Sequence, residues 1–191
     1  MYRTAMIMVT SFFWVGFSLS AHADQYVLEK PHTQILFFCD HLGFSKSQGE
    51  FLDFSGHFKY DPEKIEDASV KVTIKTASIS MDDGPWDDHV KNEDFFHVEE
   101  YPTMTFVSTS IEPLEGKKFN IHGNLTLLGQ TKPVVLNAKH NKSGVHPFSK
   151  DFIAGFSATT TVKRSEFGME YGLPMIGDDI EVRLEVEGIR Q

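Results

Sequence analysis

The feature that most constrains this chain is a regular alternation of apolar and polar residues along most of its length. The clearest segment is 180–187, where a charged residue follows each of Ile180, Val182, Leu184 and Val186. A two-residue period indicates a β-strand with one buried face and one solvated face. Similar patterns occur at roughly 33–41, 49–60, 70–75, 103–111, 118–127, 132–141 and 152–163, which makes eight predicted strands.

Turn signals separate these segments and keep most connections short. They occur at Asp61-Pro62, Pro113 to Gly116, Gly129-Gln130, Ser143-Gly144 and Gly172 to Gly177. Short connections make consecutive strands antiparallel neighbours. The exception is 81–102, where Asp83 and Pro85 precede a short predicted helix over Trp86–Lys91. We therefore predict one all-β domain over residues 24–191, with a short helix in the 81–102 connection.

Eight antiparallel strands with one apolar face each can close into a barrel or stack as a sandwich, and the pattern alone does not choose. A barrel of this size is either filled by its own side chains or holds one slender ligand. The seventeen phenylalanines supply a large core. The predicted inward faces also carry small residues, which either leave room for a ligand or fit neighbouring large side chains: Gly56, Gly123, Ala154 and Ala158.

Residues 1–23 have the composition of a cleaved secretory signal peptide. Arg3 is followed by an uncharged apolar stretch from Ala5 to Leu19, and Ala21-His22-Ala23 matches an A-x-A cleavage site. The apolar stretch is shorter than the roughly 20 residues that span a bilayer. We expect export to the periplasm and a mature chain that does not span the membrane.

The charge and cysteine content narrow the partners further. The net charge is −9, and it becomes one unit more negative without residues 1–23, whose only charged residue is Arg3. An acidic chain without a dense Lys/Arg cluster is a poor partner for nucleic acid or anionic membranes. Cys39 is the only cysteine, so no internal disulfide can form, and its apolar strand indicates a small buried side chain.

Short motifs occur in a fixed order along most of the predicted mature chain. They are His32 to Phe37, His41 to Ser45, Gly49 to Phe51 with Phe54 and Gly56, Asp94 to Phe96, Tyr101 to Phe106, Gly123 to Thr126, Gly129 to Val134, and Arg164 to Met169. In this order they resemble the YceI-like family of bacterial periplasmic proteins. The resemblance implies a lipocalin-like, eight-stranded antiparallel barrel whose interior binds a polyisoprenoid, an isoprenoid quinone or a related long amphiphile.

An apolar tunnel suits such a ligand physically, because each buried methylene contributes about 0.8 kcal/mol without any polar recognition. The alternation predicts which side chains line the tunnel, although a one-residue slip would reverse the face of a strand. These residues are Ile35, Phe37, Phe54, Phe58, Val72, Ile74, Met104, Phe106, Phe119, Ile121, Leu125, Leu136, Phe156, Val182 and Leu184.

The polar candidates for contact with a head group are His41, His89 and Arg164. The two histidines fall in family-like segments, and each would either touch the ligand or form structural hydrogen bonds. Arg164 could bind a phosphate or carbonyl, or could pair with a carboxylate such as Asp88 or Asp94. Two positions depart from the family pattern: Trp86 stands where arginine is common, and His97 where aspartate is common. The first departure favours a less charged head group.

Catalysis finds little support in the sequence. It contains no HExxH, C-x-x-C or G-x-S-x-G motif and no glycine-rich loop that opens a helix. We therefore predict no catalytic residue, no metal site and no cofactor beyond the bound lipid or quinone. Two alternatives remain: a metal-dependent enzyme that uses His41 and His89, and a stress-related scaffold with a filled barrel and an acidic binding surface. The sequence leaves homodimer formation open.

Overall fold

The computed structural model describes residues 23–191, so the predicted signal peptide lies almost entirely outside the described residues. No helix among the described residues is both long and apolar enough to cross a membrane. The strands are β1 (Asp24–Leu28), β2 (Gln34–His41), β3 (Ser45–Phe51), β4 (Phe54–Tyr60), β5 (Ser69–Lys75), β6 (Ile79–Ser80), β7 (Thr103–Pro113), β8 (Lys118–Leu127), β9 (Gln130–Val145), β10 (Phe152–Lys163) and β11 (Ile176–Arg190). The helices are α1 (Gly84–Lys91) and the 3₁₀ turns η1 (Ile65–Asp67), η2 (Thr76–Ser78) and η3 (Arg164–Phe167).

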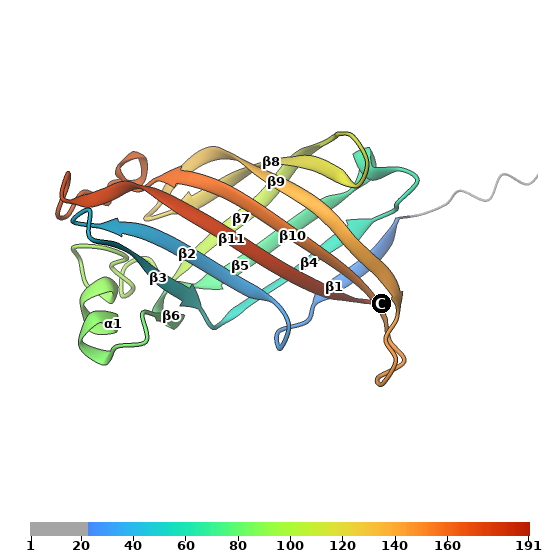
Figure 1. Cartoon of the computed structure of the whole chain (residues 1–191), viewed down its shortest axis with the longest axis horizontal. Helices are drawn as coiled ribbons and strands as arrows, with labels where there is room; N and C mark the ends of the chain where they lie inside the picture. Colours follow the sequence, from blue (N-terminus) through green and yellow to red (C-terminus); the bar gives the residue numbers. More distant parts are fainter. Residues whose placement is uncertain (1–22) are drawn as a thin grey trace, which may run out of the picture.

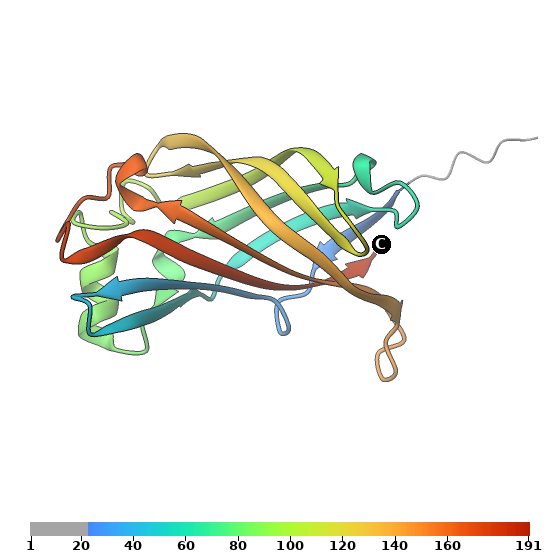
Figure 2. The same cartoon turned by 45° about the horizontal axis from the view of Figure 1, so that its top comes forward.

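All eleven strands belong to one antiparallel sheet that closes on itself (Figures 1 and 2). Eight of them form the ring β1-β4-β5-β7-β8-β9-β10-β11, and the pairing of β1 with β11 closes it. The remaining strands β2, β3 and β6 extend from β11 in that order. The prediction of an all-β, eight-stranded antiparallel barrel with one short helix is confirmed.

The three extra strands continue ring strands after an interruption. Both β1 and β2 pair with the same edge of β11, through Leu28 opposite Gly188 and Gln34 opposite Glu185. In the same way β4 pairs with β1 and β3 pairs with β2, so β3 continues the line of β4. β5 pairs with β4 and β6 pairs with β3, so β6 continues the line of β5. The strand β6 has only two residues and ends the sheet, and α1 lies beside it (Figure 1).

Two details differ from the sequence prediction. The segment 49–60 is divided between β3 and β4 by Leu52 and Asp53. Phe51 and Phe54 are both buried although an odd separation would place them on opposite faces, so the interruption resets the alternation. The short strand β1, whose Tyr26 is buried, was not predicted, because its five residues show too little alternation.

One end of the barrel is packed with aromatic rings. Tyr26 stacks on Phe58 with ring centroids 4.8 Å apart, and Phe156 meets Phe58 and Tyr60 edge-on at 5.4 and 4.9 Å. These four rings, here called the aromatic cluster, lie toward the end where β1 and the C-terminus are found (Figure 1). The helix α1 lies at the opposite end.

Three glycines of the sheet lie very close to neighbouring side chains or backbone. A Cβ built on Gly123 would lie 2.3 Å from Cζ of Phe106, and one on Gly188 would lie 2.3 Å from Cε1 of Phe58. A Cβ on Gly56 would lie 2.6 Å from the carbonyl oxygen of Lys71. At these positions glycine allows an aromatic ring or a neighbouring strand to approach closely. Gly56 and Gly123, two of the small residues named from the sequence, therefore allow close packing and do not enlarge the space for a ligand.

Candidate ligand-binding site

The barrel contains a cavity of about 520 Å³ whose lining is predominantly apolar and includes some exposed residues. This volume falls within the range of about 300–1,000 Å³ that is common for small-molecule sites. The lining begins near the aromatic cluster, at Phe58 and Tyr60, and reaches Trp86 and Tyr171 near α1. The barrel is thus not filled by its own side chains, and the space runs lengthwise between its two ends.

Fourteen of the fifteen side chains predicted to line a tunnel do border this cavity. They are Ile35, Phe37, Phe58, Val72, Ile74, Met104, Phe106, Phe119, Ile121, Leu125, Leu136, Phe156, Val182 and Leu184. Contact with a ligand is not observed, so their binding role stays a prediction.

Phe54 is the exception and corrects the prediction. It is buried in the same cluster as Ile74 and Met104 but does not border the cavity. Phe51, on the other side of the interruption between β3 and β4, borders it instead. The broken strand changes which phenylalanine faces the open space, and continuous alternation could not reveal that change.

Other lining residues come from the long connections, where periodicity gives no signal. Val90, Phe95 and Phe96 belong to α1 and the loop after it, and Met169 and Tyr171 follow η3. Phe96 meets Phe51 edge-on at 5.5 Å, so the 81–102 connection packs directly onto the barrel interior. The loops at the α1 end therefore build part of the cavity wall.

Polar lining residues gather mainly at the α1 end. Asp40, His41, Ser47, His89 and Arg164 all border the cavity there. Elsewhere the polar lining includes the exposed Lys59 and Ser69 near the aromatic cluster, the buried Thr33 between β1 and β2, and Thr160 on β10. All three polar residues proposed from the sequence as head-group contacts, His41, His89 and Arg164, thus share one end of the cavity. Their contact with a ligand remains a prediction.

The two histidines have different neighbours. The His41 ring lies 6.1 Å from the Trp86 ring, between centroids, and both border the cavity. His89 Nε2 lies 3.3 Å from a carboxylate oxygen of Asp94, and its ring meets Tyr171 edge-on at 5.3 Å. Trp86, the departure from the family pattern, therefore lies at the polar end of the cavity, where it adds apolar surface.

His97, the second departure, does not border the cavity. Its backbone has a positive φ of 41°, and its Nδ1 lies 3.4 Å from a carboxylate oxygen of Glu100. The ring meets Tyr101 edge-on at 5.8 Å. Its surroundings are those of a turn residue.

Arg164 is buried and forms hydrogen bonds with backbone carbonyls. Its Nε donates to Gly177 O at 2.8 Å, Nη1 to Met169 O at 2.9 Å and Nη2 to Ile176 O at 3.0 Å. The expected pairing with Asp88 or Asp94 is wrong, because the side chain reaches Met169 in the loop after η3 and the first two residues of β11 instead. Among the described residues Arg164 has no carboxylate partner in an ion pair. The guanidinium fixes the loop in place and leaves a positive charge beside the cavity.

Cys39 borders the cavity close to this arginine. Its Sγ lies 3.5 Å from Gly177 O, the carbonyl that also accepts from Arg164. Burial raises the pKa of the thiol above 9.0, and the Arg164 charge only partly opposes this effect. A raised pKa favours the neutral thiol over the nucleophilic thiolate, and Cys39 forms part of the cavity wall.

Candidate metal ligands do not converge around His41 and His89. Among residues 23–191, the group of three or more ligating side chains whose atoms lie within 4.8 Å of one another is Glu29, His32 and Glu187. None of these three borders the cavity. The metal-dependent enzyme considered from the sequence lacks a converging ligand set at His41 and His89.

Comparison with known proteins agrees with this architecture. The YceI-like domain matches residues 26–188. A UPF0312 protein of Azotobacter vinelandii is 38% identical over 173 residues, which cover 90% of each chain.

Solved structures share the fold. BcnA of Burkholderia cenocepacia superposes with a TM-score of 0.77 at 26% identity, over 84% of this chain and 98% of that one. A polyisoprenoid binding domain from Saccharophagus degradans, implicated in plant cell wall breakdown, superposes with a TM-score of 0.61 over 87% of this chain and 98% of its own. At 12% identity this second likeness concerns the fold alone. From the domain match and the relative's identity, the chain belongs to the YceI-like family.

Proposed function

We propose that this protein binds one long apolar lipid, a polyisoprenoid or an isoprenoid quinone, inside its barrel and performs no chemistry on it. The observation that carries the proposal is the lengthwise cavity of about 520 Å³ with a predominantly apolar lining. Burying a chain there gains about 0.8 kcal/mol for each methylene removed from water. The Saccharophagus degradans domain, named for polyisoprenoid binding, has the same fold and supports this class of ligand.

The lipid would lie with its apolar tail toward the aromatic cluster and its polar group toward α1. Arg164, His41 and His89 supply donors at that end, whereas Phe58, Tyr60 and Phe156 surround the other. A buried guanidinium without a carboxylate partner favours a group that accepts hydrogen bonds, such as a phosphate, a hydroxyl or a quinone carbonyl. The nearby apolar Trp86 ring favours a small head group over a bulky charged one.

Export belongs to the same proposal. The composition of residues 1–23 supports a periplasmic location, where a sequestered lipid could be carried or stored. The alternative of a scaffold with a filled barrel is disfavoured by the cavity.

The test is a variant that blocks the cavity and a neighbour that does not. Ala158 borders the cavity on β10, and the adjacent Thr159 is exposed on the opposite face. Ala158→Phe should reduce the affinity for an added polyprenol by about tenfold or more, because the ring displaces at least two methylenes of the chain. Thr159→Phe adds the same ring outside the barrel and should leave the affinity unchanged.

Lipid binding is measured by native mass spectrometry, and folding of both variants by thermal melting. Equal affinity in the two folded variants would contradict binding inside the barrel. Ala158→Phe is expected to lower the free energy of unfolding by about 1–3 kcal/mol through overpacking. Thermal melting measures this loss of stability separately from the loss of lipid affinity.

A further inference from the structure

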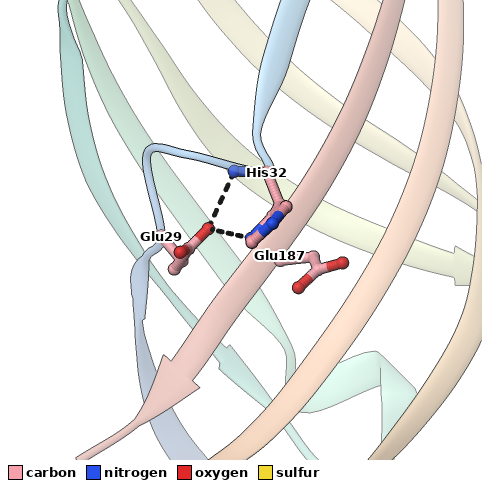
Figure 3. Close-up of side chains that lie close together, drawn as sticks. All are labelled: Glu29, His32 and Glu187. Carbon is pink, nitrogen blue, oxygen red and sulfur yellow. Dashed lines mark hydrogen bonds and ion pairs between the residues drawn. The ribbon is translucent and has the colours of Figure 1, made fainter. Parts of the chain in front are cut away.

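A cluster of metal-ligating side chains lies outside the cavity, since none of its three residues borders it. Glu29 and His32 belong to the turn between β1 and β2, and Glu187 lies on the neighbouring strand β11 (Figure 3). One ligand atom from each residue lies within 4.8 Å of the other two. We propose that Glu29, His32 and Glu187 bind a divalent transition-metal ion, with Zn²⁺ as the representative ion.

The backbone already brings the two carboxylates together. Glu29 N donates to Glu187 O at 2.8 Å, and the buried Thr33 hydroxyl lies 3.2 Å from the same carbonyl. Glu187 N donates in turn to Thr33 Oγ1 at 3.1 Å. These hydrogen bonds fix the turn against β11, so little ordering remains to be done when an ion binds.

Apart from His32, which contacts Glu29, no basic side chain pairs with the two carboxylates in the described part of the chain. Among the described residues, neither Glu29 nor Glu187 forms an ion pair with a lysine or arginine. Lys30, the lysine of the same turn, pairs with Asp53 at 2.6 Å instead. The Glu29 side chain is only 18% exposed. A mostly buried carboxylate beside a second one gains from a bound cation.

The ligand types and spacing suit Zn²⁺ or a similar ion. Carboxylate oxygens and an imidazole nitrogen bind Zn²⁺ at about 2.0–2.2 Å, so two tetrahedral ligands lie roughly 3.3–3.5 Å apart. His32 Nδ1 and Glu29 Oε2 lie 3.1 Å apart as a hydrogen bond, and the same oxygen accepts from His32 N at 2.8 Å (Figure 3). An ion would replace the bond between the two side chains at nearly the same spacing. Coordination requires the tautomer with the proton on Nε2 and a rotation of the Glu187 carboxylate toward the ring.

A groove lies beside the cluster and would give solvent access to the remaining coordination positions of an ion. His32 and Glu187 border this groove of about 300 Å³, together with His146 and Lys142. Three protein ligands and an open position are typical of sites that keep water or exchange ligands. The ion would join the β1–β2 turn to β11 and would thus stabilise the strand interruption.

Zinc-dependent thermal melting of the full mature chain, prepared without a histidine tag and stripped with a chelator, tests the proposal. At free Zn²⁺ about 100 times the dissociation constant, the melting temperature should rise by about 5–10 °C. His32→Ala and Glu187→Gln should each lose most of this shift. His57→Ala, which removes an exposed histidine on β4, should retain it.

Titration calorimetry with Zn²⁺ supplies the second measurement, because it counts sites independently of stability. We expect one Zn²⁺ site in the wild type and in His57→Ala. The affinity of this site should be at least tenfold weaker in His32→Ala and in Glu187→Gln. Absence of zinc binding in the wild type, or binding unchanged in both cluster variants, would overturn the proposal. Because the site lies outside the cavity, neither result bears on lipid binding.

Discussion

The two ends of this barrel are closed in different ways. At the end near the C-terminus, Tyr26, Phe58, Tyr60 and Phe156 pack ring against ring inside regular strands. At the other end, α1 and the loop after η3 cover the opening, and the buried Arg164 holds that loop through backbone carbonyls. The first closure depends on apolar packing and the second on hydrogen bonds to irregular backbone.

Because of this difference, we expect one end to determine the stability of the barrel and the other to admit the lipid. Close-packed rings in a strand framework open only when the barrel unfolds, whereas loops held by a few hydrogen bonds can open locally at lower free energy. The polar lining residues also gather at the loop-covered end. We therefore expect a lipid to enter beside α1, tail first, while the aromatic cluster stays closed.

The largest effect is expected from removing the centre of the aromatic cluster. Phe58→Ala deletes a ring that stacks on Tyr26, meets Phe156 edge-on and covers Gly188. It should lower the free energy of unfolding by about 3–5 kcal/mol, measured by urea denaturation. Leu52→Ala, at an exposed leucine, should change it by less than about 0.5 kcal/mol. A loss below about 1 kcal/mol for Phe58→Ala would show that this end is not closed by packing.

A smaller and more local effect is expected at the α1 end. Arg164→Lys keeps the charge but replaces the planar group that donates to three carbonyls. Leaving buried carbonyls without donors should lower the free energy of unfolding by about 1–3 kcal/mol. Hydrogen exchange should accelerate mainly within residues 168–177.

The matched substitution is Arg183→Lys, at an exposed arginine on β11 that pairs with Glu185. It should have little effect on either stability or exchange. Uniformly faster exchange over the whole barrel in Arg164→Lys would contradict a local role for the arginine.

The smallest effect concerns pH at the aromatic end. His140 lies between Tyr60 and Phe156, with its centroid 5.1 and 5.3 Å from theirs. Burial lowers the pKa of His140 below its ordinary 6.5, and the Lys117 charge lowers it further. The unfolded chain therefore takes up the proton first, so stability present above about pH 6.5 is lost as the pH falls toward the folded pKa.

The measurement is the melting temperature of wild type and His140→Gln between about pH 8 and pH 5. The variant cannot titrate at this position, so its melting temperature should fall less on acidification. Parallel pH profiles for the two proteins would show that His140 does not contribute.

The sequence predicts the regular part of this molecule well. Alternation in segments such as 118–127 and 180–187 identifies residues like Phe119, Leu125 and Val182, all of which border the cavity. The reason is physical, since each strand of a barrel has one inward face along its whole length. Where a strand is interrupted, as between Phe51 and Phe54, the two-residue period no longer specifies the face.

Contacts between distant segments could not be predicted in this way. Arg164 was recognised as a residue of interest, but its carbonyl partners, in the loop after η3 and at the start of β11, depend on geometry that no local pattern encodes. The approach of Glu29 and His32 to Glu187 depends on β11 returning beside β1. Such contacts follow from the closure of the barrel, which short-range periodicity does not describe.

The most direct test of the central claim is native mass spectrometry of the mature protein purified without detergent, followed by organic extraction. The account predicts that the mass of the native protein exceeds that of the chain by one lipid molecule. The extract should contain a long-chain isoprenoid or quinone in stoichiometric amount. A protein that carries no ligand and also fails to take up added polyprenyl lipid would contradict the account.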